Sequence, residues 1–300
     1  MPVTADQEAP LVPVSGDFSD AVTFAFGDLE ADVYGVARVG LSSGADGEPQ
    51  ASGLAIVFDG HEAIAVRAAG GLAVSERDWT AIDAAGLTTA IDTPLAEWTV
   101  KFESEDGDVT FDLRFESTVP PYAVPEKSAV AKAGGMQSYD HLCRVTGTAN
   151  IAGEARNIHC LGQRGHSWGA PDWDKITLAR TVSAWMGEDL GVVLTAVRPD
   201  KAQTHSDEAI AAAILGPDGV VHIDDPRLST TYDSGGRQRR ASLELYEDDE
   251  DDSFARRVGG DVVCGTSLDL GNLRLDCAFF RWQMEGREGI GRYDILRRAT

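Results

Sequence analysis

Apolar and polar residues alternate strictly along most of the chain, and long runs with the helical period are nearly absent. The clearest example is a pair of alternating segments joined by the turn residues Asp106-Gly107, which predicts a β-hairpin. Its apolar residues share one face: Trp98, Val100, Phe102, Val109, Phe111, Leu113 and Phe115. Similar turns are expected at residues 59–60, 216–219 and 271–272. Because consecutive hairpins build antiparallel sheets, the pattern predicts an all-β protein.

A proline- and glycine-rich segment, residues 117–135, interrupts this alternation. We expect it to join two β domains, residues 17–120 and residues 136–300. Each contains enough short strands for a closed or nearly closed barrel, which is a common way to avoid exposed sheet edges. Residues 1–16 are acidic and proline-bearing, and they are expected to form a loose lead-in.

The formal net charge of -23 over 300 residues makes nucleic acids and anionic membranes poor partners, since a strongly negative surface repels polyanions. No segment approaches the roughly 18 uninterrupted apolar residues of a membrane helix, and no export signal is evident. We therefore expect a cytoplasmic protein. Its cysteines lack metal-site spacing and are expected to be buried thiols. A disulfide between Cys143 and Cys160 is geometrically conceivable but is not expected in the cytoplasm.

The segment Gln163–Trp173 concentrates ionisable and aromatic residues that a core strand would not need. It contains Arg164, His166, Trp168, Asp172 and Trp173. By strand parity, Tyr139, His141 and Cys143 share one face of the preceding strand, and Trp185 lies on one face of the following strand. Trp79 and Trp98 are expected to fill the core. The simplest alternative to a functional site is a hairpin corner whose charged groups face water.

Several chemistries compete for this constellation. A zinc site would need His141, His159 and His166 to converge, and no ligand spacing in the sequence supports it. A serine hydrolase centred on Ser167 would lack the usual nucleophile elbow. The third possibility is an apolar pocket in which an acid protonates a carbon–carbon double bond and aromatic faces stabilise the cation. In that case Asp172 or His166 would be the acid.

The remaining candidates would serve this third site in supporting roles. Arg164 or Tyr139 would orient the acid, and His141 would contact the substrate. Trp168, Trp173 and Trp185 would form the aromatic wall. Hydration or cyclisation would follow protonation.

The chain resembles the lipocalin-like superfamily of carotenoid 1,2-hydratase (hydroxyneurosporene synthase) and tocopherol cyclase. The resemblance lies in the run Gly162–Gly169, in the Asp172-Trp173 pair that follows it, and in a terminal strand at residues 286–293. The superfamily includes bacterial proteins of unknown function. The resemblance implies two consecutive lipocalin-like barrels or sandwiches, a hydrophobic small-molecule ligand between or within them, and no organic cofactor. The residue spacing itself gives no reason to expect a metal. The chain departs from the family pattern at Gly165 and Pro171, where an acid and an arginine are expected. A non-catalytic carrier of hydrophobic molecules therefore stays as the alternative.

An acidic run occupies residues 247–252. Because like charges at this density repel one another, we expect a solvated loop. A calcium site is not expected, since the run lacks alternating ligands around a turn glycine.

Overall fold

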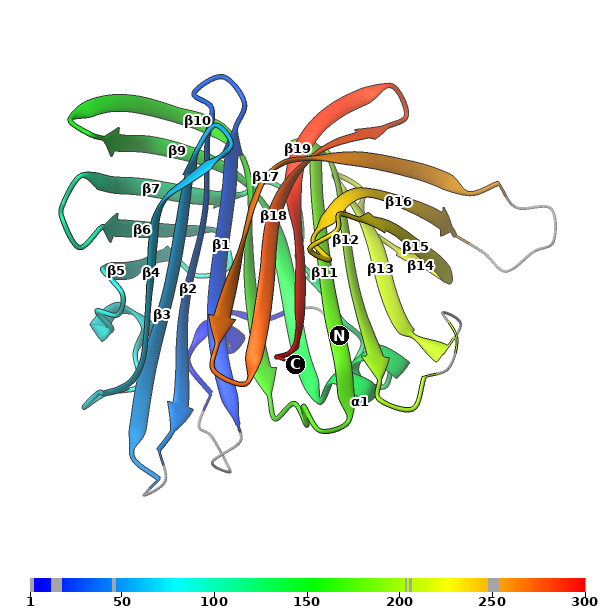
Figure 1. Ribbon diagram of the computed structural model, residues 1–300, viewed down its shortest axis with the longest axis horizontal. Coiled ribbons are helices and arrows are strands. Elements are labelled where there is room, and N and C mark those ends of the chain that lie inside the picture. Colours follow the sequence, from blue (N-terminus) through cyan, green and yellow to red (C-terminus); the bar gives the residue numbers. More distant parts are fainter. Residues whose placement is uncertain are drawn as a thin grey trace. The chain divides into compact units, whose positions relative to one another are not determined.

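The computed structural model describes residues 3–11, 18–44, 47–202, 204, 207–247 and 254–299. As predicted, the protein is all-β, and its strands form two antiparallel sheets (Figure 1). Helical structure in the described residues is limited to short segments: the 3-10 turns η1 (Ala5–Glu8) and η2 (Trp79–Ala81), and the helix α1 (Ala129–Gly134). None of these described helices has the length and apolar character needed to cross a membrane.

The first sheet contains all strands up to residue 169, and of the two sheets one forms a half-barrel and the other a nearly closed barrel. Its neighbouring strands follow the order β4-β3-β2-β1-β10-β9-β7-β6-β5, and β8 pairs with β9. The strands are β1 (Ser19–Asp28), β2 (Val33–Ser43), β3 (Pro49–Asp59), β4 (Glu62–Ala73), β5 (Leu87–Thr93), β6 (Glu97–Glu103), β7 (Val109–Ser117), β8 (Tyr122–Ala123), β9 (Met136–Ile151) and β10 (Glu154–Gly169).

The second sheet repeats this path with the remaining strands, and β15 also lies against β13. Its order is β14-β13-β12-β11-β19-β18-β17-β16-β15. The strands are β11 (Ile176–Gly187), β12 (Leu190–Pro199), β13 (Ala209–Gly216), β14 (Gly219–Ile223), β15 (Asp225–Tyr232), β16 (Gln238–Tyr246), β17 (Arg256–Leu270), β18 (Leu273–Met284) and β19 (Arg287–Arg298).

The hairpin predicted around Asp106-Gly107 is confirmed as β6 and β7. Gly107 has a positive φ of 78°, which suits glycine at this turn, and Ser104 N–H donates to the Val109 carbonyl at 2.8 Å. The apolar residues predicted to share a face are all buried in the first core. The other expected turns also join hairpins, namely β3 to β4, β13 to β14 and β17 to β18.

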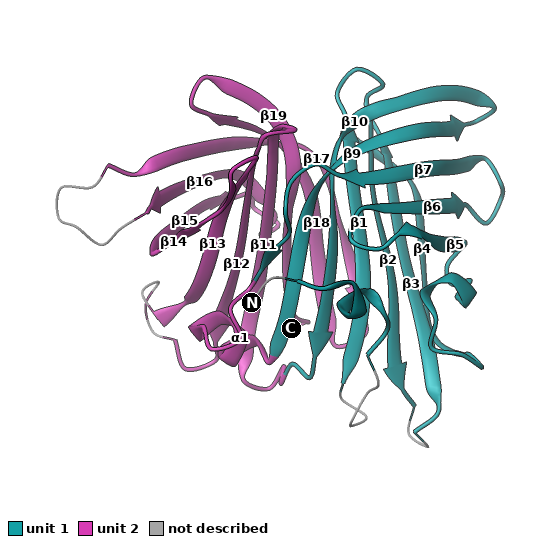
Figure 2. Cartoon of the chain, turned by 180° about the vertical axis from the view of Figure 1, so that it is seen from behind, with its two compact units in different colours: residues 1–123, 136–171 teal, residues 124–135, 172–300 magenta. Residues whose placement is uncertain are grey.

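The expected domain boundary at residues 117–135 was wrong. The first compact unit comprises residues 1–123 and 136–171, and the second comprises residues 124–135 and 172–300 (Figure 2). After the proline- and glycine-rich break the chain returns to the first sheet, because β9 pairs with β7 and β10 pairs with β1. Such a break shows where pairing stops, and it does not specify which sheet the next strand joins.

Candidate functional site

The pairing of β9 with β10 positions the polar side chains of the motif. Tyr139 lies opposite His166, and His141 lies opposite Arg164. Directly opposed residues of an antiparallel pair project from the same face. On β1, Phe24 pairs with Arg164, and this phenylalanine belongs to the first hydrophobic core. The polar residues therefore project from the core face of the sheet.

His166 is held between hydrogen-bond acceptors. Its Nε2 lies 2.6 Å from Asp20 Oδ1, and its Nδ1 lies 2.9 Å from the carbonyl oxygen of Gln7. Both His166 and Asp20 are at most 1% exposed. The second oxygen of Asp20 accepts the Leu11 N–H at 2.6 Å, which suits an ionised carboxylate. Both ring nitrogens of His166 therefore face oxygen atoms that can accept a hydrogen bond from a protonated ring nitrogen.

A carboxylate from the N-terminal segment completes the cluster. Glu8 is 2% exposed and forms an ion pair with the fully buried guanidinium of Arg164. Trp98 Nε1 donates to Glu8 Oε2 at 2.7 Å, and the Tyr139 hydroxyl donates to Glu8 Oε1 at 3.0 Å. The indole of Trp79 donates to the Glu8 carbonyl at 2.9 Å. Residues 3–11 are therefore anchored to the first sheet, which corrects the expectation of a loose lead-in.

Burial sets the protonation of the neighbouring groups. Burial and the nearby charge of Glu8 raise the pKa of Tyr139 above its ordinary range, so its hydroxyl stays protonated. Burial and the charge of Arg164 hold the pKa of His141 well below its usual value, so this imidazole is neutral. His141 Nδ1 lies 2.9 Å from Ser117 Oγ. Burial raises the pKa of the Cys143 thiol to about 11.

Aromatic rings surround the imidazole. The ring centroid of His166 lies 5.1 Å from that of Trp168, 5.4 Å from that of Tyr139 and 5.7 Å from that of Trp79. The Arg164 guanidinium carbon lies 5.3 Å from the centroid of the Trp98 ring. Trp79 and Trp98 are core residues, as predicted, and their indole N–H groups also make them part of the polar cluster.

The structure thus brings together the predicted residues Tyr139, His141, Arg164, His166 and Trp168. Asp172 does not join them, because it is exposed and its carboxylate lies 2.6 Å from Lys175 Nζ. The hydrogen bond from Lys175 lowers the pKa of Asp172 below its usual value. This placement contradicts its predicted role as a neutral acid in an apolar cavity.

The other tryptophans are placed differently from the prediction. Trp173 is half-buried and belongs to the second unit. Trp185 also belongs to the second unit, where it packs against Phe279 and donates to Ser183 Oγ at 2.5 Å. Parity along a strand carries no information about which unit the strand after residue 171 joins.

The alternative chemistries find no support in the geometry. His159 and Ser167 have the opposite parity to His166 on the regular strand β10, and His159 is exposed. The zinc set therefore does not converge. No group of metal-ligating side chains occurs among the residues that the structure describes. The hairpin-corner alternative is wrong, since Arg164 and His166 are buried. The cysteines are free thiols.

Gly165, where the resemblance implies an acid, lies on the sheet face opposite to His166. A Cβ atom at this position would lie 2.6 Å from Asp140 Oδ1. Asp140 accepts a hydrogen bond from Gln163 on that same face. An acid at position 165 would therefore point away from the cluster that contains His166.

The second unit has a buried ion pair of its own. Arg180 Nε donates to Glu208 Oε1 at 3.0 Å, and Arg180 Nη2 pairs with the other carboxylate oxygen. Arg180 Nη1 lies 3.5 Å from Thr230 Oγ1, whose hydroxyl is 2.7 Å from that of Tyr293. Each guanidinium nitrogen of this arginine therefore has an acceptor, as expected for a buried charge with a structural role.

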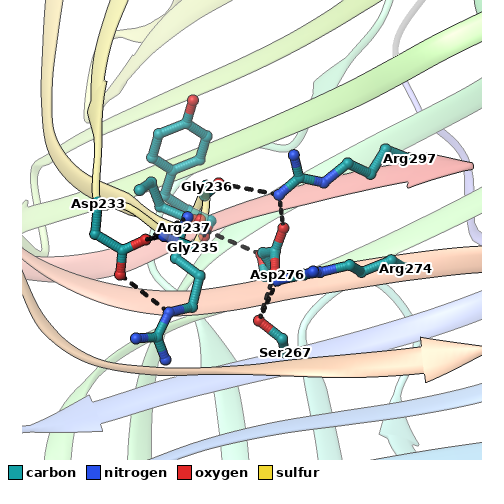
Figure 3. Close-up of polar contacts among 10 residues, drawn as sticks. Asp233, Gly235, Gly236, Arg237, Ser267, Arg274, Asp276 and Arg297 are labelled. Atoms are coloured by element: carbon teal, nitrogen blue, oxygen red, sulfur yellow. Dashed lines mark hydrogen bonds and ion pairs between the residues drawn. The ribbon is translucent and has the colours of Figure 1, made fainter. Parts of the chain in front are cut away.

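Another network in the second unit centres on the Asp276 carboxylate (Figure 3). It accepts hydrogen bonds from Ser267, Arg274 and Arg297, and Arg297 also donates to the carbonyl of Gly236 at 2.9 Å. Burial raises the pKa of Asp276, but these donors outweigh burial and hold it below its usual value. Because Gly236 lies in the turn between β15 and β16, the network fastens that turn to β18 and β19.

Comparison with solved structures supports the fold. The chain is similar to a protein described as an AttH from Nitrosomonas europaea, with a TM-score of 0.70, 12% identity, and coverage of 96% of this chain and 98% of the other. It is also similar to kievitone hydratase from Nectria haematococca, with a TM-score of 0.63, 12% identity, and coverage of 99% and 93%. CghA, crystallised with Sch210972, gives a TM-score of 0.62, 13% identity, and coverage of 97% and 94%.

At these identities the likeness establishes the shared fold. A search of the curated proteins gives no match. A family model described as "Domain of unknown function (DUF7064)" matches residues 4–299, which include both units and the polar cluster. The chain therefore belongs to the DUF7064 family.

Proposed function

We propose that this protein is a cofactor-independent acid–base enzyme that protonates a double bond of a hydrophobic alkene, with hydration or cyclisation to follow. The observation that carries the proposal is the His166 imidazole, held between Asp20 and the Gln7 carbonyl among aromatic rings. The fold that the chain shares with kievitone hydratase adds support. We infer that the substrate is isoprenoid, terpenoid or polyketide-like, and that the protein belongs to the lipocalin-like hydratase and cyclase superfamily.

In the proposed reaction His166 donates its Nδ1 proton to one alkene carbon, and the adjacent carbon becomes a carbocation. The faces of Trp79 and Trp168 stabilise this cation by cation–π attraction. Water then adds to the cation and returns a proton to the imidazole, so the net reaction is hydration. Capture by a second double bond of the substrate, followed by proton loss to the imidazole, gives cyclisation. Asp20 holds the ring in orientation and stabilises its charged form.

The test follows the transferred proton. Native mass spectrometry of the purified protein identifies a retained ligand, and that ligand, or geraniol as a general isoprenoid alkene, is then incubated with enzyme in D₂O. Protonation by the enzyme puts deuterium on carbon, where it does not exchange back. His166→Gln should lower the labelling rate by about a hundredfold or more, because general acid catalysis contributes on that order.

Asp172→Asn is the matched control, because Asp172 is an exposed carboxylate of the same motif and pairs with Lys175. Labelling in this variant should equal that of the wild type. If Asp172→Asn abolished labelling and His166→Gln preserved it, the assignment of the acid would be wrong.

The second candidate is a carrier that binds a hydrophobic molecule without changing it. The observation that favours it is the closure of the cluster by the protein's own N-terminal residues, which leaves His166 and Arg164 at most 1% exposed. A retained ligand that gains no carbon-bound deuterium would support this candidate over the enzyme. Trp168→Ala should then weaken ligand binding by loss of ring contacts.

A further inference from the structure

The cover of the polar cluster is a short piece of chain outside the sheet, residues 3–11, which we name the N-terminal strap. It contains the single turn η1 (Ala5–Glu8) and no strand. Its contacts with the cluster include the Gln7 carbonyl on His166, the Glu8 carboxylate on Arg164 and the Leu11 N–H on Asp20. The strap therefore contacts the first sheet as a bound peptide would, through a carboxylate and backbone groups.

The receptor for the Glu8 carboxylate is built by the sheet. Trp98 on β6, Tyr139 on β9 and Arg164 on β10 all direct a donor at it. The Arg164 guanidinium carbon also lies over the Trp98 ring, 5.3 Å from its centroid, which favours the cation by cation–π attraction. A set of convergent donors on rigid strands, with an arginine at its centre, is the usual protein site for a carboxylate.

Glu8 leaves some hydrogen-bonding atoms of this site without a partner. Arg164 Nε and Nη2 are buried without a hydrogen-bond partner among the described residues, and so is His141 Nε2 on the opposite strand. The Arg180–Glu208 pair of the second unit provides the internal comparison, since there the carboxylate binds through both oxygens and every guanidinium nitrogen has an acceptor. Unpaired buried N–H groups are costly, so they indicate an acceptor that Glu8 does not supply.

We propose that Arg164, Tyr139 and Trp98 form a binding site for the carboxylate of a hydrophobic ligand, and that Glu8 of the N-terminal strap is its intramolecular occupant. A ligand carboxylate can bind Arg164 through both oxygens and reach His141, which Glu8 does not do. When the strap leaves, the Gln7 carbonyl also leaves Nδ1 of His166. This inference rests on the proposed function, which identifies the cluster around His166 as the active site. It adds that the substrate carries a carboxylate, and that binding of this carboxylate displaces the strap and exposes His166.

The test measures binding without turnover. The affinity of the full chain for 1-naphthoate, an aromatic carboxylate, is compared by isothermal titration calorimetry with that for 1-naphthylmethanol, its neutral counterpart. Glu8→Ala removes the occupant. Asp6→Ala is the matched control, because Asp6 is an exposed acid of the same turn. If the strap-displaced state is a minor population of the wild type, Glu8→Ala should bind 1-naphthoate about tenfold or more tightly than the wild type or Asp6→Ala.

The neutral alcohol should show no such gain, because it cannot replace the Glu8 charge. Equal affinities of Glu8→Ala and wild type for 1-naphthoate would overturn the inference. So would an equal gain for both probes. Circular dichroism checks the fold of Glu8→Ala, and if this variant does not fold, Glu8→Gln, which keeps the side-chain shape, takes its place with the same expectation. If neither variant folds, the strap is a structural closure and the inference is wrong.

The outcome separates this inference from the proposed function. If Glu8→Ala binds 1-naphthoate tightly but deuterium labelling does not depend on His166, the carboxylate site is supported and the proposed enzymatic function is contradicted. If deuterium labelling depends on His166 but Glu8→Ala binds 1-naphthoate no more tightly than the wild type, the proposed enzymatic function is supported and the carboxylate site is contradicted.

Discussion

Replacing Arg164 with methionine isolates the energetic role of the buried ion pair. The substitution keeps an unbranched side chain of similar reach but removes the charge, so Glu8 becomes a buried anion without a counter-ion. Breaking a buried pair in this way generally costs about 3–5 kcal/mol of unfolding free energy. Trp98 and Tyr139 continue to donate to Glu8, so we expect a loss near the lower bound, about 3 kcal/mol.

The double variant Glu8→Gln with Arg164→Met measures the cost of the unpaired Glu8 charge. It removes both charges, and it also removes Arg164 Nε and Nη2, which lack partners among the described residues. Arg164→Met alone also lacks those two donors, and it differs from the double variant only in keeping the buried Glu8 charge without a counter-ion. Because an unpaired buried charge is costly, the double variant should be more stable than Arg164→Met alone. Urea unfolding followed by tryptophan fluorescence measures these differences, because Trp79 and Trp98 lie in this core.

Lys101→Met is the control, since Lys101 pairs with Asp112 on the surface with both side chains more than half exposed. Such pairs contribute about 0–1 kcal/mol. A loss of less than about 1 kcal/mol for Arg164→Met, equal to that of the control, would refute the view that the Glu8–Arg164 pair is a desolvated charge pair.

Further expectations concern the second unit and the sheet face opposite to the cluster. Asp276→Asn should lower the unfolding free energy at pH 7 by about 1–3 kcal/mol, because the folded state depresses the pKa of Asp276. That contribution is present above the unfolded pKa of about 3.9 and disappears as the pH falls through the lower, folded pKa. Urea midpoints of variant and wild type should therefore converge as the pH falls below the folded pKa. Gly165→Ala should cost about 1–3 kcal/mol in the same assay by its contact with Asp140, and it should leave deuterium labelling unchanged. A short Gly-Ser loop in place of residues 247–252 should leave the melting temperature nearly unchanged by calorimetry. Of this run only Glu247 lies within the described residues, and its partner Arg256 also pairs with Glu285.

The predicted fold class needed only local information. Apolar residues alternate in β6 and β7 because one face of each strand is buried in the core, so the hairpin and its buried face could be identified from the sequence. The same parity argument placed Tyr139 and His141 on one face of β9. The motif on β10 likewise pointed to Arg164 and His166, because buried ionisable residues are rare in a strand without partners.

The partners of those residues lie far away along the chain. Glu8 is 156 positions from Arg164, and Asp20 is 146 positions from His166. A lone acid in an acidic, proline-bearing segment carries no local signal that it will be buried, so the sequence predicts only a loose lead-in there. The division of strands between sheets was equally hidden, since the break at residues 117–135 could not show that β9 would return to β7.

The sequence by itself therefore determined the all-β class, the hairpins, and the strand face that Tyr139 and His141 share, because these depend on the period of two within single strands. Only the tertiary structure decided that Glu8 and Asp20 supply the counter-charges, that Asp172 is exposed beside Lys175, and that the units divide at residue 171. The physical reason is that strand pairing and the desolvation of charges depend on segments distant in sequence, and no local pattern encodes those contacts.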